Sequence, residues 1–450
     1  MIPARKAAVA QTGPGDIPLP IGKMSMIMAV LVVMLIGRPA EWIPGLGFIP
    51  VTRIVFLIAA IYAFRVAATL SPVRLMSLPQ LKCAMFFLAL AVFSITFSIY
   101  KSNTLAFIPG PIVLLLSITL LVKAIPSVAD AERIFIAMVI SAIALTIGTL
   151  LAYQGGRAEI GTENTSYDPN DLSYVLITTL PIAAALYTVS SGLKKLLLMG
   201  GIVAMLLTMV LTGSRGGYIA LFLVAMLFTF KPIALAKDGR LREVRFGSAF
   251  VRILALVIVL SLAWVVAPPE IKSRMMTLVD IGSDYNSNMS DNSSRLVIWK
   301  RHALATFDRP TGFGLGSANT VDGLYGGLYK TTHNTVVQAM VELGFLGLFL
   351  LLGAYYFSWR DLRIAEAFSK KSPQPLSPEQ LRIALYSRAF RMSLVGNLAS
   401  GFFLSQAYGP MLWVTIAMCG VLVYLQRAAT GQPEPQKTRG RRARKPATAT

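Results

Sequence analysis

Long apolar runs dominate this chain of 450 residues, and short polar segments separate them. A helix that crosses a membrane needs roughly 20 mostly apolar residues, and twelve stretches approach that length. They lack the alternation of β-barrel strands, which have about ten residues each. The pattern predicts an all-α integral membrane protein with about twelve transmembrane helices, over Ile21–Gly37, Val51–Leu70, Cys83–Ile99, Phe107–Leu121, Ile134–Tyr153, Leu172–Val189, Leu196–Thr212, Gly217–Phe230, Ile253–Val266, Thr335–Ser358, Met392–Gln406 and Pro410–Leu425.

The composition agrees with this class. Only 14% of the residues are charged, whereas soluble proteins average about 25%. The first apolar run follows a polar tail and lacks a small-residue cleavage site, so we expect a signal anchor rather than a cleaved signal peptide. Cys83 and Cys419 both fall in predicted spans, where we expect small core residues and no disulfide.

The net charge of +21 sets the orientation. Lysine and arginine accumulate on cytoplasmic loops, and most of the 42 lie on the side that holds both termini. We therefore expect cytoplasmic tails at 1–20 and 428–450, a membrane domain over 21–427, and a long periplasmic loop over 268–334. The basic tail from Lys437 to Lys445 is expected to be disordered and to contact anionic lipids, not nucleic acid.

Two polar segments should contain helices of their own. In the long loop, Ser294–Phe307 has helical spacing that places Leu296, Trp299, Ala303 and Phe307 on one face. Asp308-Arg-Pro should end that helix, and the stretch from Gly312 to Gly316 should form a turn. In the loop after the tenth run, Ser377-Pro-Glu-Gln is typical of a helix start and predicts a cytoplasmic surface helix.

Arg215 is the first candidate for chemistry. It lies between two apolar runs in Leu211-Thr-Gly-Ser-Arg-Gly-Gly-Tyr218, near the predicted outer surface. An arginine there is costly unless it is paired or functional, although it could simply anchor the helix at the interface. The flanking glycines favour function, because they would let a ligand approach the backbone.

Arg295, His333 and His302 lie in the long loop. Arg295 opens its predicted helix and could be an ordinary surface charge. His333 precedes Asn334 and an apolar run, so its ring should lie at the boundary of water and lipid on the outer side. A lone histidine is as readily structural as catalytic, and His302 is expected to be a helix-surface residue.

Together these residues are typical of an anion site with a base. Two arginines can hold a diphosphate through charge-assisted hydrogen bonds, and a neutral histidine can accept a proton from a hydroxyl. No His, Cys, Asp or Glu cluster has the spacing of metal ligands. We expect neither a metal nor another cofactor.

Four motifs resemble those of the O-antigen ligase/O-antigen polymerase family. They are Asp168-Pro-Asn170, Ser214-Arg-Gly216, the Arg295-x-x-x-Trp299 helix followed by Gly312-Phe-Gly-Leu-Gly316, and the segment from His333 to Gly347 with the pattern H-N-x₇-E-L-G-x-x-G. The resemblance covers roughly residues 153–352.

The resemblance implies a metal-independent membrane glycosyltransferase of the GT-C type, in the bacterial inner membrane with a periplasmic active site. The donor would be a glycan on undecaprenyl diphosphate. The acceptor would be a hydroxyl of lipid A–core, of a second lipid-linked glycan or of a protein. Arg215 and Arg295 would hold the diphosphate and His333 would activate the acceptor. Ser214, Asn334 and Asn170, which stand in the same motifs, would support them.

Two other functions fit the same hydropathy pattern. A flippase for lipid-linked oligosaccharides would also have twelve spans with both ends inside, but it should carry ionisable residues at mid-membrane. Only Arg53 and Arg65 approach the middle of a predicted span, and the polar residues are concentrated in one outer loop. A structural scaffold would not need a cluster of histidine and arginine.

Overall fold

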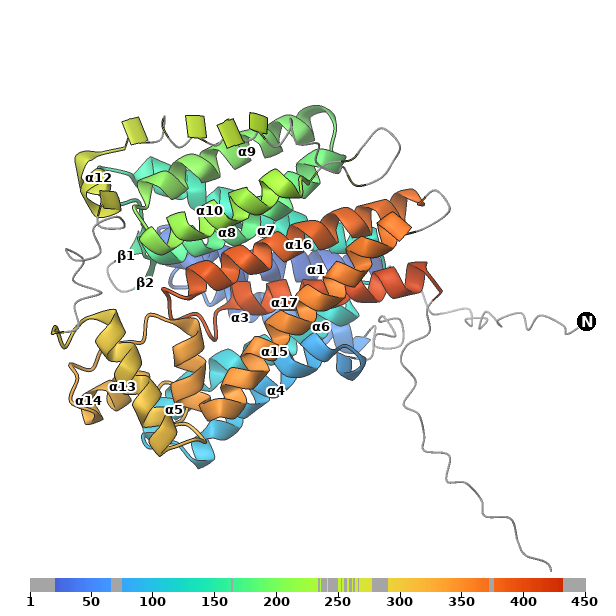
Figure 1. Cartoon of the computed structure of the whole chain (residues 1–450). Coiled ribbons are helices and arrows are strands. Elements are labelled where there is room, and N and C mark those ends of the chain that lie inside the picture. The colour runs from blue at the N-terminus through green and yellow to red at the C-terminus, as the bar shows by residue number, and fades with distance from the viewer. Residues whose placement is uncertain are drawn as a thin grey trace, which may run out of the picture.

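The computed structural model is a bundle of long helices with one two-stranded antiparallel sheet (Figure 1). It describes residues 21–65, 75–162, 165–233, 267–276, 290–371 and 376–431, together with scattered positions between 235 and 265. The all-helical class is confirmed. The elements in chain order are α1 (Ile21–Val32), η1 (Val33–Gly37), α2 (Pro39–Trp42), α3 (Val51–Arg65), η3 (Leu75–Ser77), α4 (Pro79–Phe93), η4 (Ser94–Thr96), α5 (Lys101–Phe107), α6 (Pro109–Lys123), α7 (Val128–Ala152), β1 (Ile160–Thr162), β2 (Thr165–Tyr167), α8 (Pro169–Val189), α9 (Gly192–Leu211), α10 (Arg215–Phe230), α12 (Pro269–Met276), α13 (Arg295–Asp308), α14 (Ala318–Leu324), α15 (Thr335–Lys371), α16 (Pro378–Gly401) and α17 (Pro410–Ala429).

Seven helical segments are long and apolar enough to cross a membrane. Two further apolar helices, Lys23–Gly37 and Arg215–Phe230, are shorter. The chain is therefore a multi-pass membrane protein, and the count of twelve spans stays a prediction. The predicted span Ile253–Val266 lies partly outside the described residues, as do the N-terminal tail 1–20 and most of the basic tail 428–450. The seven are Pro79–Thr96, Lys101–Lys123, Val128–Ala152, Pro169–Val189, Gly192–Leu211, Thr335–Phe368 and Pro410–Ala429.

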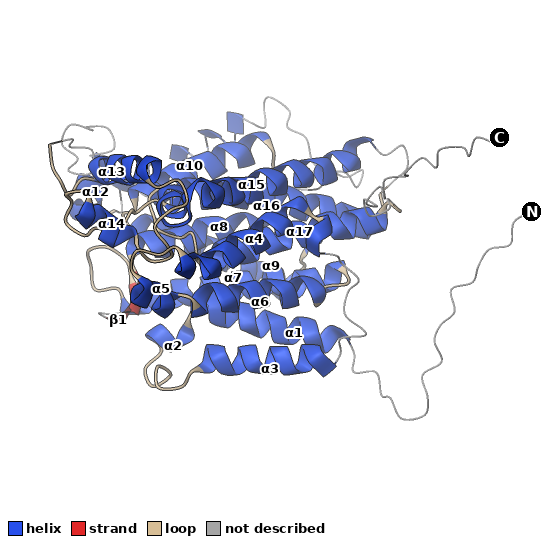
Figure 2. Ribbon diagram, turned by 90° about the horizontal axis from the view of Figure 1, so that it is seen from below, coloured by secondary structure: helices blue, strands red, loops and turns tan. Residues whose placement is uncertain are grey.

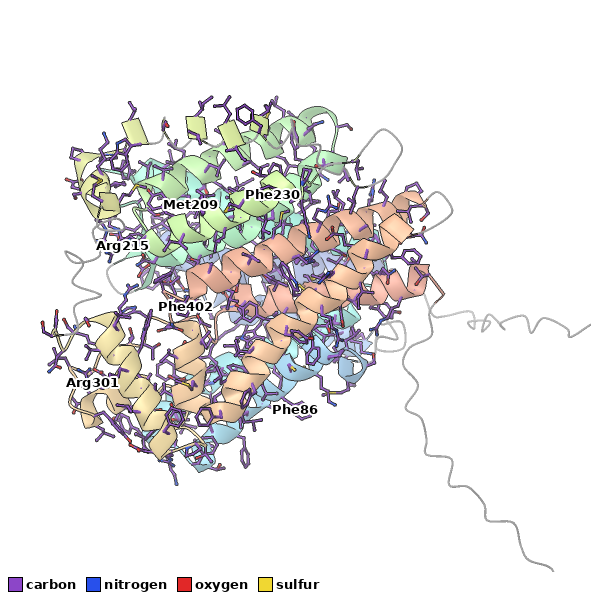
Figure 3. All side chains as sticks on the ribbon, in the orientation of Figure 1. Phe86, Met209, Arg215, Phe230, Arg301 and Phe402 are labelled. Atoms are coloured by element: carbon purple, nitrogen blue, oxygen red, sulfur yellow. The ribbon has the colours of Figure 1, made fainter. Side chains whose placement is uncertain are left out.

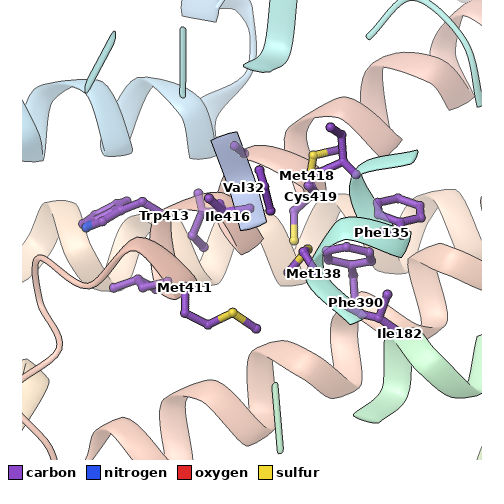
Figure 4. Close-up of a cluster of buried hydrophobic side chains, with 14 of the residues drawn as sticks. Val32, Phe135, Met138, Ile182, Phe390, Met411, Trp413, Ile416, Met418 and Cys419 are labelled. Carbon is purple, nitrogen blue, oxygen red and sulfur yellow. The ribbon is translucent and has the colours of Figure 1, made fainter. Parts of the chain in front are cut away.

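The centre of the bundle is formed by α8, α16 and α17. In the most apolar stretch of α17, 83% of the residues are buried, against 28% for α9. The helix α9 therefore lies at the periphery, where its apolar side chains can face lipid. Cys419 lies in the packed centre (Figure 4), and Cys83 is half-buried. Both cysteines are free, as the sequence predicts.

The predicted surface helix after Ser377 is not a separate element. Ser377 does cap a helix and forms a reciprocal capping box with Gln380, but that helix continues unbroken to Gly401. Its residues from Ile383 to Met392 are buried, because Arg388 and Arg391 both bind Glu366 of α15. This buried pairing lets a helix with several charges pack inside the bundle.

The helix α15 is broken at Gly344, where φ is 67° and ψ is −166°. The loop after α13 fills the break: the amides of Phe313 and Gly314 donate to the carbonyls of Val341 and Glu342, at 3.0 and 2.8 Å. Carbonyls freed by a break at membrane depth need such partners. Added side chains would not fit, since a Cβ at Gly312 would lie 2.4 Å from the Gly344 nitrogen.

The connecting segments gather at two ends of the bundle. Figures 1 and 2 both show α12, α13, α14 and β1 at one end. There, Ile99 donates to the Phe313 carbonyl at 3.1 Å, and the hydroxyls of Thr332 and Ser405 lie 2.8 Å apart. We call this the loop end. At the opposite end of the bundle, Arg382 of α16 binds Glu132 of α7.

Candidate active site

The first turn of α8 forms one wall of the site at the loop end. Asp168 caps the helix, and its Oδ1 accepts from the amides of Asn170 and Asp171 at 2.7 and 2.8 Å. The side chain of Asn170 joins two other segments, because its Oδ1 accepts from Ser214 Oγ at 2.9 Å and from Arg157 Nη2 at 3.2 Å. The structure therefore brings together Asn170 and Ser214, which lie 44 residues apart in the sequence.

Arg215 stands at the start of α10, beside this wall. Ser214 is the N-cap of the helix and accepts from the Gly217 amide at 3.2 Å. Gly213 before it has φ of 56°, a left-handed conformation that favours glycine. Figure 3 shows Arg215 at the same end of the bundle as Arg301 of α13.

The prediction that the glycines beside Arg215 let a ligand approach the backbone is wrong for Gly216 and Gly217. A Cβ at Gly216 would lie 2.7 Å from the ring of Phe403, and one at Gly217 would lie 2.7 Å from Ser173 Oγ. Both positions are therefore filled by neighbouring side chains. These glycines permit close packing and do not open the backbone to a ligand.

Arg295 reaches the same region from the long loop. It is the first residue of α13, and Ser294 caps that helix. Its Nη1 donates to the Phe403 carbonyl at 3.4 Å, while the Phe403 ring packs over Gly216 next to Arg215. Phe403 is thus a shared neighbour of the segments that carry the two arginines.

Trp299 lies one helical turn after Arg295, and it holds the segment that carries His333. Its Nε1 donates to the Thr332 carbonyl at 2.7 Å, and its ring meets Phe402 edge-on at 5.2 Å. Residues four apart share a helix face. The Arg295-x-x-x-Trp299 motif therefore contacts both the 402–403 turn and the residue before His333.

His333 has a left-handed backbone, with φ of 42°. Such a conformation is uncommon outside glycine and is worth about 1–3 kcal/mol of strain, so the flanking contacts must maintain it. Asn334 contributes by capping α15, since its Oδ1 accepts from the amides of Val336 and Val337 at 2.9 and 3.0 Å. Asn334 thus supports His333 through the backbone.

The charged groups around His333 come from several of these segments. Burial lowers the pKa of His333 below its ordinary value of 6.5, and the charge of Arg295 lowers it further. Asp168 acts on this pKa in the opposite direction, and Lys330 lowers it. His333 therefore lies within electrostatic reach of Arg295 and of the α8 cap, and it is held neutral near pH 7.

A buried ion pair holds the chain segment that leads to His333. Arg301 binds Asp322 of α14 at 2.6 Å, and Asp322 Oδ2 accepts from the Lys330 amide at 3.0 Å. Asp322 is fully buried. The pair ties α13 and α14 to the segment three residues before His333.

His302 is a buried residue, and the prediction that it lies on the helix surface is wrong. Its ring nitrogens lie 2.9 Å from the carbonyls of Ile298 and Ala318, and burial lowers its pKa. The predicted helix is present as α13, and on its apolar face Leu296 and Phe307 are exposed, whereas Ala305 is buried. The helix turns a partly polar face inward because α14 supplies its hydrogen bonds.

Two contributors to the site were missed by the sequence analysis. Arg157 donates through Nε to the Thr212 carbonyl at 2.9 Å, in addition to binding Asn170. Phe403 lies in the turn after α16. Arg157 lies shortly before the Asp168-Pro-Asn170 motif in the sequence, and this proximity was the available signal. Nothing in the pattern marked Phe403.

A cavity of about 540 Å³ adjoins this site. Thr331 and Thr332, directly before His333, form part of its lining, as do Gln406 and Glu342. Within the described ranges, no group of three or more His, Cys, Asp or Glu side chains could hold a metal ion.

Residues 200–352 match the family model described as O-Antigen ligase. The chain carries an O-antigen ligase family domain. The matched segment contains Arg215, Arg295 and His333, and it ends within α15. A search of curated proteins finds no match. A domain of this family points to glycan transfer by a membrane protein.

Proposed function

We propose that this O-antigen ligase family protein transfers a glycan from undecaprenyl diphosphate to an acceptor hydroxyl on the periplasmic face of the inner membrane. One observation carries the proposal: His333, Arg295 and the Asp168–Asn170–Ser214 wall beside Arg215 meet at one end of the bundle, although they come from four separate segments. The acceptor is lipid A–core, a second lipid-linked glycan or a protein hydroxyl.

The arginines supply the diphosphate site in this proposal. A guanidinium binds two phosphate oxygens at once, and its charge does not depend on pH. Phe403 contacts Arg295 and Gly216, the residue after Arg215, and Arg157 binds Asn170 beside the segment that leads into Arg215. Their positive charge would stabilise the diphosphate as the bond to the sugar breaks.

His333 is the base in this proposal. The acceptor hydroxyl gives its proton to the neutral imidazole, and its oxygen attacks the anomeric carbon of the donor. The bond from that carbon to the diphosphate oxygen breaks, and its electron pair leaves with undecaprenyl diphosphate. Because burial and Arg295 both lower the pKa of His333, the ring is ready to accept a proton near pH 7.

Deletion of the gene and complementation would test this function in cells. Without the transferase, the lipid-linked glycan should accumulate on the periplasmic face, and the wild-type gene should restore transfer where His333→Ala does not. A flippase would behave differently, because its loss would leave the same glycan on the cytoplasmic face. Accumulation there would contradict the proposal.

A further inference from the structure

The cavity that Thr331 and Thr332 line is formed by residues other than the arginines of the proposed diphosphate site. Its lining comes from distant segments, including Arg38 before α2, Asn319 of α14, Glu342 of α15, and Gln406 and Tyr408 between α16 and α17. Arg157, Arg215 and Arg295 are not among its lining residues. Thr331 and Thr332, which lead into His333, therefore connect this cavity to the proposed base.

The buried polar groups on the cavity wall suit a ligand with hydroxyls. Glu342 and Tyr408 are neighbours there, and Glu342 is only 2% exposed. The carboxyl of Glu342 and the hydroxyl of Tyr408 interact with each other, and Gln338 also reaches the Glu342 side chain. Both side chains line the cavity, so a hydroxyl of a bound molecule can join this buried hydrogen-bonded pair.

The remaining lining favours a sugar ring. The rings of Tyr100 and Phe107 contribute apolar faces, and Asn319 offers an amide. Aromatic faces, amides and a carboxylate together match the C–H faces and hydroxyls of a pyranose. The volume also lies in the range of small-molecule sites, about 300–1,000 Å³.

The charge of Arg38 does not make this cavity a second diphosphate site. Arg38 lies 3.6 Å from Glu41 and stacks on the ring of Tyr167 at 4.8 Å. Its guanidinium is thus already engaged, and it is the only cation among the described residues that line the cavity. A diphosphate would find no pair of free cations among these lining residues, whereas a neutral sugar needs none.

We propose that this cavity is a saccharide subsite, which holds a pyranose unit of the reacting glycans next to His333. The inference rests on the proposed glycosyl transfer and adds where a sugar binds. That sugar belongs either to the donor, next to the diphosphate, or to the acceptor.

Binding measurements on the full chain in nanodiscs would test the subsite. The probes are an array of bacterial glycans, undecaprenyl diphosphate without sugar, and undecaprenyl diphosphate carrying one N-acetylhexosamine. Asn319→Trp would fill the cavity from its exposed side, and Glu342→Gln would change its buried acceptor. Leu324→Trp is the matched control, because it is exposed on the same helix but does not line the cavity.

Both cavity variants should weaken saccharide binding about tenfold or more, the effect of losing roughly one good hydrogen bond, while the control should not. If the subsite holds the donor sugar, the loss appears for the sugar-bearing lipid; if it holds the acceptor sugar, it appears for free glycans. Saccharide binding that is absent, or unchanged in both variants, would overturn the subsite. Failure of sugar-free undecaprenyl diphosphate to bind would instead count against the proposed function.

Discussion

Phe403 contacts Arg295 and the residue that follows Arg215, and the role proposed for these arginines makes the identity of each one testable. Its carbonyl accepts from Arg295 and its ring covers Gly216, next to Arg215. Arginine and lysine carry the same charge, but only the planar guanidinium grips two phosphate oxygens at once. A diphosphate site should therefore discriminate between them.

Arg215→Lys should lose transfer nearly as severely as Arg215→Ala. The expected loss is about 10²–10³ in rate, the usual effect of removing one donor to a developing negative charge. Initial rates with the purified protein would measure it. Arg382→Lys is the control, since that residue lies in an exposed pair with Glu132 at the opposite end. Full activity of Arg215→Lys would reduce Arg215 to an interfacial anchor.

The pH profile should report the state of His333. Burial and Arg295 lower its pKa below 6.5, and the protonated ring cannot accept a proton. The value of kcat/KM should therefore stay constant through neutral pH and fall only as the pH drops below 6.5. An acid limb centred above that value would show that His333 is not the group that titrates.

At the scale of elements, the break in α15 and the loop after α13 depend on each other. The loop amides satisfy carbonyls at the break, and Gly312 lies against the backbone of Gly344. Gly312 belongs to the Gly312-Phe-Gly-Leu-Gly316 motif, and Gly344 belongs to the motif that begins at His333. Their close approach explains why a turn and a helix carry glycine at these points.

Gly312→Ala should destabilise the protein much more than Gly326→Ala. Both glycines have φ of 83°, so alanine costs each about 1–2 kcal/mol of backbone strain. Only at Gly312 would the Cβ also meet backbone, at 2.4 Å from the Gly344 nitrogen, whereas nothing lies within 4 Å at Gly326. Thermal unfolding in detergent would compare them. Equal melting temperatures would contradict the interlocked arrangement.

At the scale of the whole molecule, hydropathy predicted the helical class, because lipid-facing helices must be apolar. Motif positions predicted that Arg215, Arg295 and His333 belong to one region. The pattern could not show that His302 is buried, since that depends on the Ala318 carbonyl, 16 residues away. It also could not show that Ser377 starts a buried helix, because Glu366 neutralises Arg388 and Arg391 from a different element.

The orientation of the bundle remains a prediction from charge. In a background with Cys83 and Cys419 replaced by alanine, Ser290→Cys should react with an impermeant maleimide in intact cells, and Ser372→Cys should not. The reason is the excess of lysine and arginine around the second position. Labelling of Ser372→Cys alone would place the loop end, and the site with it, in the cytoplasm.

The transfer reaction of the purified protein tests the central claim most directly. The donor is the undecaprenyl-diphosphate-linked glycan of the bacterium that encodes the chain, and its binding is measured in parallel with transfer. His333→Ala should bind the donor as the wild type does, yet transfer about 10²–10⁴ times more slowly, since it lacks the general base. A His333→Ala protein that transfers at the wild-type rate would contradict the account.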